Sequence, residues 1–403
     1  MEKGQSPFYP GQPVPVELFV GREREISHIL TRGVGQVERG KPVAVYVQGD
    51  YGIGKSSIAR YLQFLAAEKH GLVPVNVSLS LSKTIEDLAT SIVEGVLYSG
   101  AIHSSRGERL RQWLARYIGK QDLFGFTINL EALRKDAPQL ASVHGILAFL
   151  RETVEKAKEK EPGTTGVFLV LDEINGLAGQ QWFAQLLKGL VDTNALAEKP
   201  LPLLLMLCGT QERRRQLIEG HQPVERIFDI VEIERMSESE MREFFQRAFD
   251  SVGLVVSDDG MKVMTLYAAG FPKLMHLIGD WAYWTASDPV IDNKVALQAV
   301  INAADDFGKK YVDQQVVAAL RSQDYRSILS KIADAGLGDG FSRGDIEKTL
   351  DESERGKLGN FLQKMKQLGV LRSGDARGEC IFNVRLVRLY LFLKNAEMRV
   401  ASN

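Results

Sequence analysis

A single glycine-rich segment sets the strongest limit on how this chain folds and what it binds. It reads Gly49-Asp50-Tyr51-Gly52-Ile53-Gly54-Lys55-Ser56 and matches the pattern GxxxxGK[ST]. An apolar run at residues 43–48 precedes it, and a helical pattern begins at Lys55. A phosphate-binding loop needs this order, because the helix points its positive end at the phosphates. The context therefore favours a phosphate loop over the alternative, a glycine-rich turn before a surface helix.

The residue types in this loop fit nucleoside triphosphate chemistry. Glycines let successive backbone N–H groups turn inward around phosphate oxygens. We predict that Lys55 neutralises the β- and γ-phosphates and that the Ser56 hydroxyl ligates Mg²⁺. The sequence thus predicts an ATPase that uses ATP and Mg²⁺. The predicted binding residues of the loop are Gly49, Asp50, Tyr51, Gly52, Ile53, Gly54, Lys55, Ser56 and the adjoining Ser57.

A second apolar run ends in two carboxylates. Residues 167–171 read VFLVL, and Asp172 and Glu173 follow them. Ligands of open α/β sheets bind at the carboxyl ends of the strands. We therefore expect Asp172 to hold the metal ion and Glu173 to polarise the attacking water. The alternative is an acidic cap on the next helix.

Polar residues also mark two other predicted strands. Thr210 follows the apolar run at residues 203–208. We predict that its side chain reaches the γ-phosphate or the attacking water; the alternative is an N-cap for the helix that follows. Asn76 and Ser78 lie on a predicted strand at residues 72–79. Both are candidates for holding Glu173 between turnovers.

The order of elements predicts an α/β fold. Continuous apolar strands separated by helices indicate a parallel sheet covered on both faces. From Ser237 the pattern turns helical, and after residue 324 three short helices precede a hairpin, which is the order of a winged helix. We expect an arm at residues 1–18, a P-loop core at 19–235 with a helical insertion near 101–160, an all-α lid at 236–318 and a winged-helix domain at 319–403.

Composition narrows the protein class further. The chain has 403 residues, 44% of them hydrophobic, which is enough for more than one core. Its net charge is −1, so any nucleic-acid contact needs a local basic face. Cys208 and Cys380 lack the spacing of a zinc site or a disulfide framework. The first 15 residues lack a signal-peptide core, and no apolar run is long enough to span a bilayer. We expect a cytoplasmic protein without a membrane partner.

Taken together, the motifs resemble those of AAA+ ATPases. The resemblance is closest to the origin-recognition-like and archaeal-ATPase (STAND-related) group and to the ATPases of transposition systems, and it extends from about residue 19 to residue 393. It implies that residues 49–56 are the Walker A motif, Asp172-Glu173 the Walker B motif and Gly209-Thr210 the sensor 1 motif. A small-molecule kinase is a poorer interpretation, because it leaves the lid and the winged helix without a role.

The resemblance implies further site residues. Val20, Gly21 and Arg22 match the segment that lies against adenine. Arg226 matches an arginine that usually reaches the γ-phosphate of a neighbouring subunit, which implies a homo-oligomer or a partner ATPase subunit. Lys273 matches sensor 2, where the family usually has arginine. The alternatives are a surface ion pair for Arg226, with Glu225 or Asp229, and a solvated first-turn lysine for Lys273.

The predicted winged helix suggests a partner. Its third helix is the expected recognition helix, and the hairpin is the wing. The cations are Arg355, Lys357, Lys364 and Lys366 on the helix and Arg372 and Arg377 on the wing. The resemblance favours an ATP-driven switch that assembles on or remodels duplex DNA. The alternative is a signalling or defence ATPase whose winged helix makes protein contacts. A basic stretch at residues 106–120 either contacts a partner or is one face of an amphipathic helix.

Overall fold

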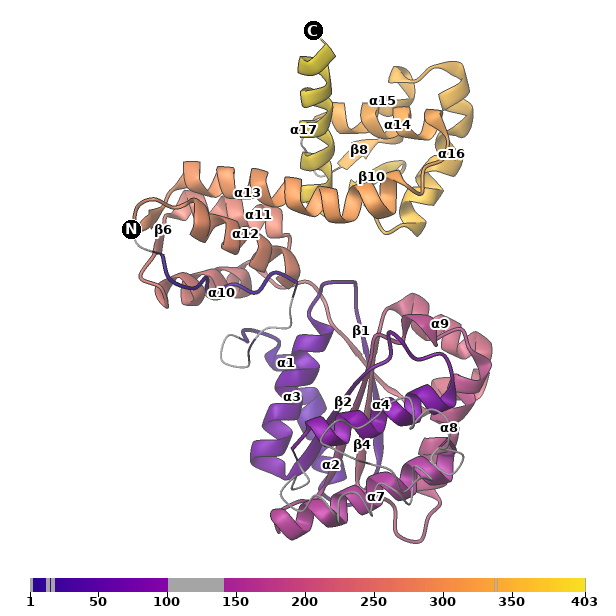
Figure 1. Cartoon of the computed structure of the whole chain (residues 1–403). Coiled ribbons are helices and arrows are strands. Elements are labelled where there is room, and N and C mark those ends of the chain that lie inside the picture. The colour runs from indigo at the N-terminus through magenta and orange to yellow at the C-terminus, as the bar shows by residue number, and fades with distance from the viewer. Residues whose placement is uncertain are drawn as a thin grey trace, which may run out of the picture. The chain divides into compact units, whose positions relative to one another are not determined.

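The computed structural model describes residues 3–11, 15, 19–100, 141–336, 338 and 340–402, which fall into two compact units (Figure 1). One unit comprises residues 13–234 and holds the glycine-rich loop. The other comprises residues 1–12 and 235–403. The basic stretch at residues 106–120 and most of the predicted insertion lie outside the described residues.

A five-stranded parallel sheet forms the centre of the first unit. Its strands lie in the order β2-β3-β4-β1-β5, and each neighbouring pair is parallel. The strands are β1 (Val43–Gln48), β2 (Leu72–Ser78), β3 (Gly166–Asp172), β4 (Leu203–Gly209) and β5 (Asp229–Glu232). Their carboxyl ends meet at one edge, where a ligand of an open α/β sheet binds. The predicted α/β fold with a parallel P-loop sheet is confirmed.

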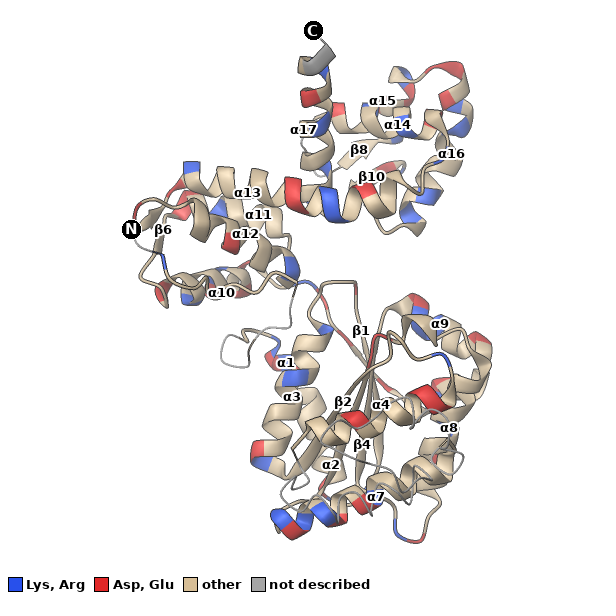
Figure 2. Ribbon diagram, in the orientation of Figure 1, with Lys and Arg blue, Asp and Glu red and all other residues tan. Residues whose placement is uncertain are grey.

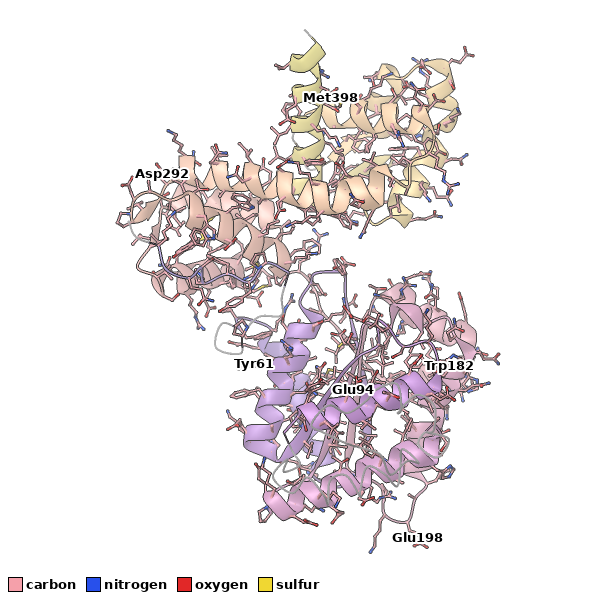
Figure 3. All side chains as sticks on the ribbon, viewed as in Figure 1. Tyr61, Glu94, Trp182, Glu198, Asp292 and Met398 are labelled. Atoms are coloured by element: carbon pink, nitrogen blue, oxygen red, sulfur yellow. The ribbon has the colours of Figure 1, made fainter. Side chains whose placement is uncertain are left out.

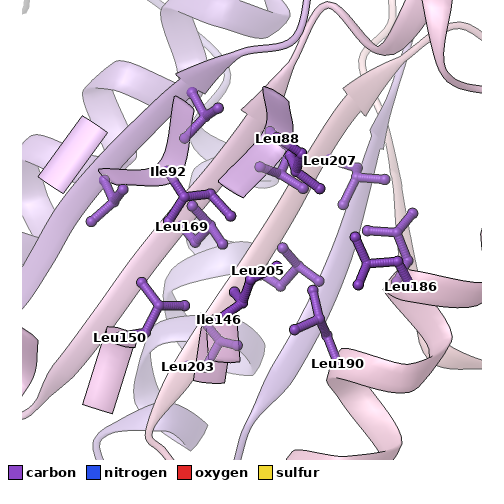
Figure 4. Packing of buried hydrophobic residues seen from close by; sticks show 14 of the residues in the cluster. Leu88, Ile92, Ile146, Leu150, Leu169, Leu186, Leu190, Leu203, Leu205 and Leu207 are labelled. Atoms are coloured by element: carbon purple, nitrogen blue, oxygen red, sulfur yellow. The ribbon is translucent and has the colours of Figure 1, made fainter. Parts of the chain in front are cut away.

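Helices surround this sheet. They are α1 (Glu23–Ile29), the π-helical η2 (Leu30–Val34), α2 (Gly35–Val37), α3 (Lys55–His70), α4 (Ile85–Tyr98), α7 (Val143–Lys160), η4 (Ile174–Gly176), α8 (Gln181–Ala195), α9 (Gln211–Gly220) and η5 (Gln222–Ile227). Figure 4 shows leucines and isoleucines of α4, α7 and α8 packed against β3 and β4. All seven residues of β4 are buried, as a strand covered on both faces requires.

The second unit begins with a lid of four helices. They are α10 (Glu238–Asp250), α11 (Asp258–Ala268), α12 (Pro272–Thr285) and α13 (Asn293–Phe307). The predicted lid was all-α, and the structure adds one short parallel pair, β6 (Val255–Val256) and β7 (Val290–Ile291). The π-helical η6 (Gly308–Val317) continues from α13 toward the C-terminal domain.

The C-terminal domain is a winged helix, as predicted. Its helices are α14 (Gln323–Asp334), α15 (Arg343–Thr349) and α16 (Glu352–Gln367). Its strands β8 (Gly340–Ser342), β9 (Leu371–Ser373) and β10 (Glu379–Phe382) form an antiparallel sheet in the order β8-β10-β9. A further helix, α17 (Arg385–Ser402), was not predicted; it packs on α13 and α14.

Residues 3–11 pack on the lid, where Figure 1 shows the indigo segment beside α10. Phe8 is buried, and its ring lies edge-on to Phe249 with 4.9 Å between centroids. Gly279 gives this ring room, because a Cβ there would lie 2.3 Å from a ring carbon of Phe8. The Tyr9 N–H donates to His276 Nδ1 at 3.1 Å. Burial lowers the pKa of His276 to about 4, so the neutral ring accepts this bond at pH 7.

Candidate nucleotide site

The glycine-rich loop joins β1 to α3 through backbone conformations that glycine adopts readily. The φ angles of Gly52 and Gly54 are 79° and 100°, both in the left-handed region. Gly54 is the N-cap of α3, and no side chain caps the helix there. The first N–H groups of a helix lack intrahelical partners, so they favour an anion at this end.

Lys55 folds back over the loop that precedes it. Its Nζ donates to the carbonyl oxygen of Gly49 at 2.9 Å and to that of Asp50 at 2.8 Å. Burial lowers the pKa of Lys55, and the nearby carboxylate of Asp172 opposes this shift. The ammonium group therefore already lies at the loop, held by two neutral acceptors that a phosphate oxygen can replace.

The end of β3 meets the start of α3. The Ser56 Oγ donates to Asp172 Oδ2 at 2.5 Å, and the Glu173 N–H donates to Asp172 Oδ1 at 2.8 Å. A hydroxyl beside a carboxylate offers two hard oxygen ligands, which suit Mg²⁺. Over the described ranges, no cluster of three or more His, Cys, Asp or Glu is arranged to hold a metal. The residues that fit as Mg²⁺ ligands are thus Ser56 and Asp172. Phosphate oxygens and water would complete the coordination.

Glu173 adopts an unusual backbone conformation and has one specific partner. Its φ of 57° lies in the left-handed region, which is uncommon for a residue other than glycine. Its Oε2 accepts a hydrogen bond of 2.7 Å from Ser78 Oγ. The register of β2 and β3 explains this contact, because Ser78 pairs with Asp172. The other candidate, Asn76, donates instead to Gln63 Oε1 at 3.2 Å.

Thr210 lies at the end of β4 and caps α9. Its Oγ1 accepts from the Arg213 N–H at 3.4 Å, which is the alternative role considered for this residue. Its carbonyl oxygen accepts from the Tyr46 hydroxyl at 3.0 Å. Arg213 Nε also donates to Asn175 Oδ1 at 3.1 Å, so α9 is tied to the segment just after Glu173. We had not predicted this link from the sequence, and contact of Thr210 with a phosphate stays a prediction.

The segment predicted to lie against adenine contacts the loop and α3. Arg22 is 6% exposed, and its guanidinium donates to the carbonyl oxygen of Ile53 at 3.2 Å. Phe19 stacks on Tyr61 of α3 with 4.6 Å between ring centroids; Figure 3 labels Tyr61. Val20 and Gly21, between these two contacts, are partly exposed. The adenine contact itself stays a prediction.

The two remaining predicted cations lie in different units. Arg226 is exposed in η5 and forms no ion pair with any residue that the structure describes. Asp229, one partner considered for it, instead binds His28 Nε2 at 2.9 Å. Lys273 is the second residue of α12, in the lid. The roles of Arg226 and Lys273 at a nucleotide stay predictions.

The cations of the winged-helix domain have different partners on α16 and on the wing. On α16, Lys357 pairs with Asp324 of α14, and Lys366 Nζ donates to Ser373 Oγ at 2.7 Å. On the wing, Arg372 and Arg377 are exposed and form no ion pair within the described ranges. Figure 2 shows that acidic residues lie among the basic ones across α14–α16. Among these cations, Lys357 is the one for which the described residues include an ion-pair partner.

Comparisons with known proteins agree with this geometry. Residues 18–218 match the family model described as an AAA ATPase domain. A Walker-type ATPase of Pyrococcus abyssi has a similar structure, with a TM-score of 0.58 at 17% identity, over 93% of this chain and 96% of that one. The ORC2 protein of Aeropyrum pernix, in ADPNP and ADP complexes, has a TM-score of 0.60 at 13% identity, over 95% of each chain. At these identities the likeness concerns the fold.

A search of the curated proteins returned no match to this sequence. Among the described residues, no helix has the length and the apolar character needed to cross a bilayer.

Proposed function

We propose that this chain, whose residues 18–218 match the model of an AAA ATPase domain, binds ATP with Mg²⁺ at residues 49–56 and hydrolyses it to assemble on or remodel duplex DNA. It acts as a homo-oligomer or with a partner ATPase subunit, in a reducing cytoplasm. One observation carries the ATPase half of this proposal. The ends of β1 and β3 bring Lys55, Ser56, Asp172 and Glu173 to the same edge of the sheet.

Each of these residues has a separate task in the proposal. Lys55 exchanges its two carbonyl partners for oxygens of the β- and γ-phosphates. Ser56 and Asp172 hold the metal ion, which when bound offsets the charge on those phosphates. Glu173 orients the attacking water, after its carboxylate leaves Ser78. Thr210, Arg226 and Lys273 are proposed to sense or contact the γ-phosphate, and Val20, Gly21 and Arg22 to border the adenine.

The hydrogen bond between Ser78 and Glu173 predicts a rate effect. We expect Ser78→Ala to raise the basal ATPase rate, because the hydroxyl stabilises the carboxylate away from its catalytic position. One such bond contributes about 0.5–1 kcal/mol, so the increase should be roughly two- to fivefold. Phosphate release at saturating ATP measures it. Ser80→Ala removes the hydroxyl that lies 3.2 Å from Ser78 Oγ and should raise the rate less than Ser78→Ala does. An unchanged or lower rate in Ser78→Ala would show that this bond does not restrain hydrolysis.

The winged helix supports the DNA half of the proposal. A cleft of about 630 Å³ lies between α16 and the wing, and its lining includes Arg343, Lys366 and Arg377. Only Asp375 and Glu379 oppose these cations there. Because the chain as a whole has a net charge of −1, DNA contact depends on such a local surface.

We expect Arg377→Glu to weaken binding of a 30-bp duplex by about tenfold at low salt. One lost phosphate contact also lowers the slope of log affinity against log salt by about one unit. Fluorescence anisotropy at two salt concentrations measures both quantities. Arg399→Glu carries the same charge change on α17, where Arg399 pairs with Asp334, and should bind as the wild type does. Equal losses in both variants would mean that net charge alone matters.

One observation favours a second candidate function. The ion pair of Lys357 with Asp324 reduces the charge that α16 offers to DNA. A signalling or defence ATPase whose winged helix contacts protein is compatible with this arrangement. If the wild-type protein shows no salt-dependent binding to any duplex, the DNA half of the proposal is wrong and this second candidate replaces it.

A further inference from the structure

The wing hairpin has two faces, and each of them borders a cleft. In the pairing of β9 with β10, Ser373 lies opposite Cys380, and Arg372 lies opposite Ile381. Successive residues of a strand point to opposite faces. Ser373 and Cys380 line the cleft beside α16, whereas Arg372 and Ile381 line a second cleft. The wing therefore separates the α16 cleft from a cleft that the lid completes.

This second cleft has strongly basic walls. Its volume is about 560 Å³. The winged-helix domain contributes Arg372 and Arg385 to the lining, and the lid side contributes Arg235 and Lys262. Glu238 is the one acidic residue of that lining. The lining thus holds four cations and one carboxylate, and a second carboxylate, that of Asp259 beside the lining, pairs with Lys262.

The charges lie at the mouth of the cleft rather than inside it. Arg235, Lys262 and Arg372 are exposed, whereas the apolar lining includes the buried Met241 and Phe382. The guanidinium of Arg235 lies 4.6 Å from the ring centroid of Phe271. The Lys262 Nζ lies 3.0 Å from Asp259 Oδ1, one turn earlier on α11. Exposed cations around a mouth suit an extended polyanion that lies across it better than a small ligand enclosed within it.

Continuity with the wing distinguishes duplex DNA from other polyanions. Arg372 lies on β9, and Arg377, which the proposed function places on a phosphate, lies in the turn of the same hairpin. Duplex DNA carries about one negative charge per 1.7 Å of its axis, so a duplex held at one face of the wing presents further phosphates nearby. An acidic protein segment would meet the second cleft without needing Arg377.

We propose that the lid is a second DNA-contacting surface, in which Lys262 and Arg235 bind phosphates of the same duplex that engages the wing. This inference rests on the DNA half of the proposed function. In this proposal the wing, rather than α16, lies at the centre of the DNA-binding surface. The α16 helix borders the wing on one side and α11 borders it on the other.

The test compares two lysines of the lid. Lys262→Glu should weaken binding of the 30-bp duplex by at least about fivefold at low salt and lower the salt slope by about one unit. Lys262→Gln, which removes the charge without reversing it, should give a smaller loss. Lys294→Glu is the matched control, because Lys294 is an exposed lysine of α13 outside the cleft lining; it should bind as the wild type does. Thermal melts confirm that the variants are folded.

Each other outcome overturns the inference. If Arg377→Glu loses affinity while Lys262→Glu binds normally, the DNA function stands and the lid contact is wrong. Equal losses in Lys262→Glu and Lys294→Glu would indicate a non-specific charge effect. If Lys262→Glu weakens binding of poly-glutamate but not of the duplex, the cleft is a protein-contact site. If the wild type binds no duplex at all, the DNA half of the proposed function and this inference fail together.

Discussion

Lys55→Ala should abolish tight ATP binding, with the affinity falling by at least about hundredfold. A hundredfold loss corresponds to about 2.7 kcal/mol, which is the scale of a charge-assisted contact to phosphate in a partly buried site. The structure already holds the ammonium 2.9 Å and 2.8 Å from two loop carbonyl oxygens, so ATP needs only to replace these acceptors. Titration with a fluorescent ATP analogue measures the loss.

The control for this variant comes from the same helix. Lys69 lies in the last turn of α3 and is exposed. Lys69→Ala removes the same charge and should leave the affinity for ATP unchanged. A folded Lys55→Ala protein that binds ATP as tightly as the wild type does would show that the glycine-rich loop is not the nucleotide site.

Glu173→Gln should stop turnover while ATP stays bound. The amide keeps the size of the side chain and an acceptor oxygen for Ser78, but it loses the negative charge that orients water. General-base groups contribute roughly 10²–10⁴-fold to rates, so we expect the hydrolysis rate to fall by at least about hundredfold. Phosphate release gives the rate, and the ATP-analogue titration gives the affinity.

A carboxylate at the far end of α3 provides the comparison. Glu68 is exposed on α3, and Glu68→Gln makes the same chemical change there. It should leave both hydrolysis and binding unchanged. If Glu173→Gln hydrolyses ATP at the wild-type rate, another group activates the water. The hydrogen bond between Glu173 and Ser78 then does not control hydrolysis.

The fold of the nucleotide unit was predictable because its signals are local. The strand, the glycines and the helix around Lys55 follow one another in the chain, so no long-range contact has to be guessed. The same holds for Asp172 and Glu173, which directly follow an apolar strand. Thr210 shows the limit of this logic. Its position after β4 was predicted, but both candidate roles fit that position, and the structure shows the capping bond.

Contacts between distant segments were not predictable in this way. Whether Asn76 or Ser78 binds Glu173 depends on the register of β2 against β3. A shift of two residues in that register would bring Asn76 to the position of Ser78. The sequence placed Lys357 on a helix but gave no sign that Asp324 of another helix would pair with it. Nothing around Phe8 indicated that its ring packs among phenylalanines of the lid.

The packing of residues 3–11 on the lid has a consequence for biosynthesis. Tyr9 and its partner His276 are 267 positions apart in the chain. Ribosomes add roughly 5–20 residues per second, so about 13–53 s pass between the synthesis of the two residues. Phe8 cannot pack in its native place during that interval, because its neighbours Phe244, Phe245 and Phe249 of α10 are made late in it and His276 of α12 is made at its end. The first described segment to be synthesised is therefore among the last to reach its native place, and the lid completes its core only after the whole nucleotide unit has left the ribosome.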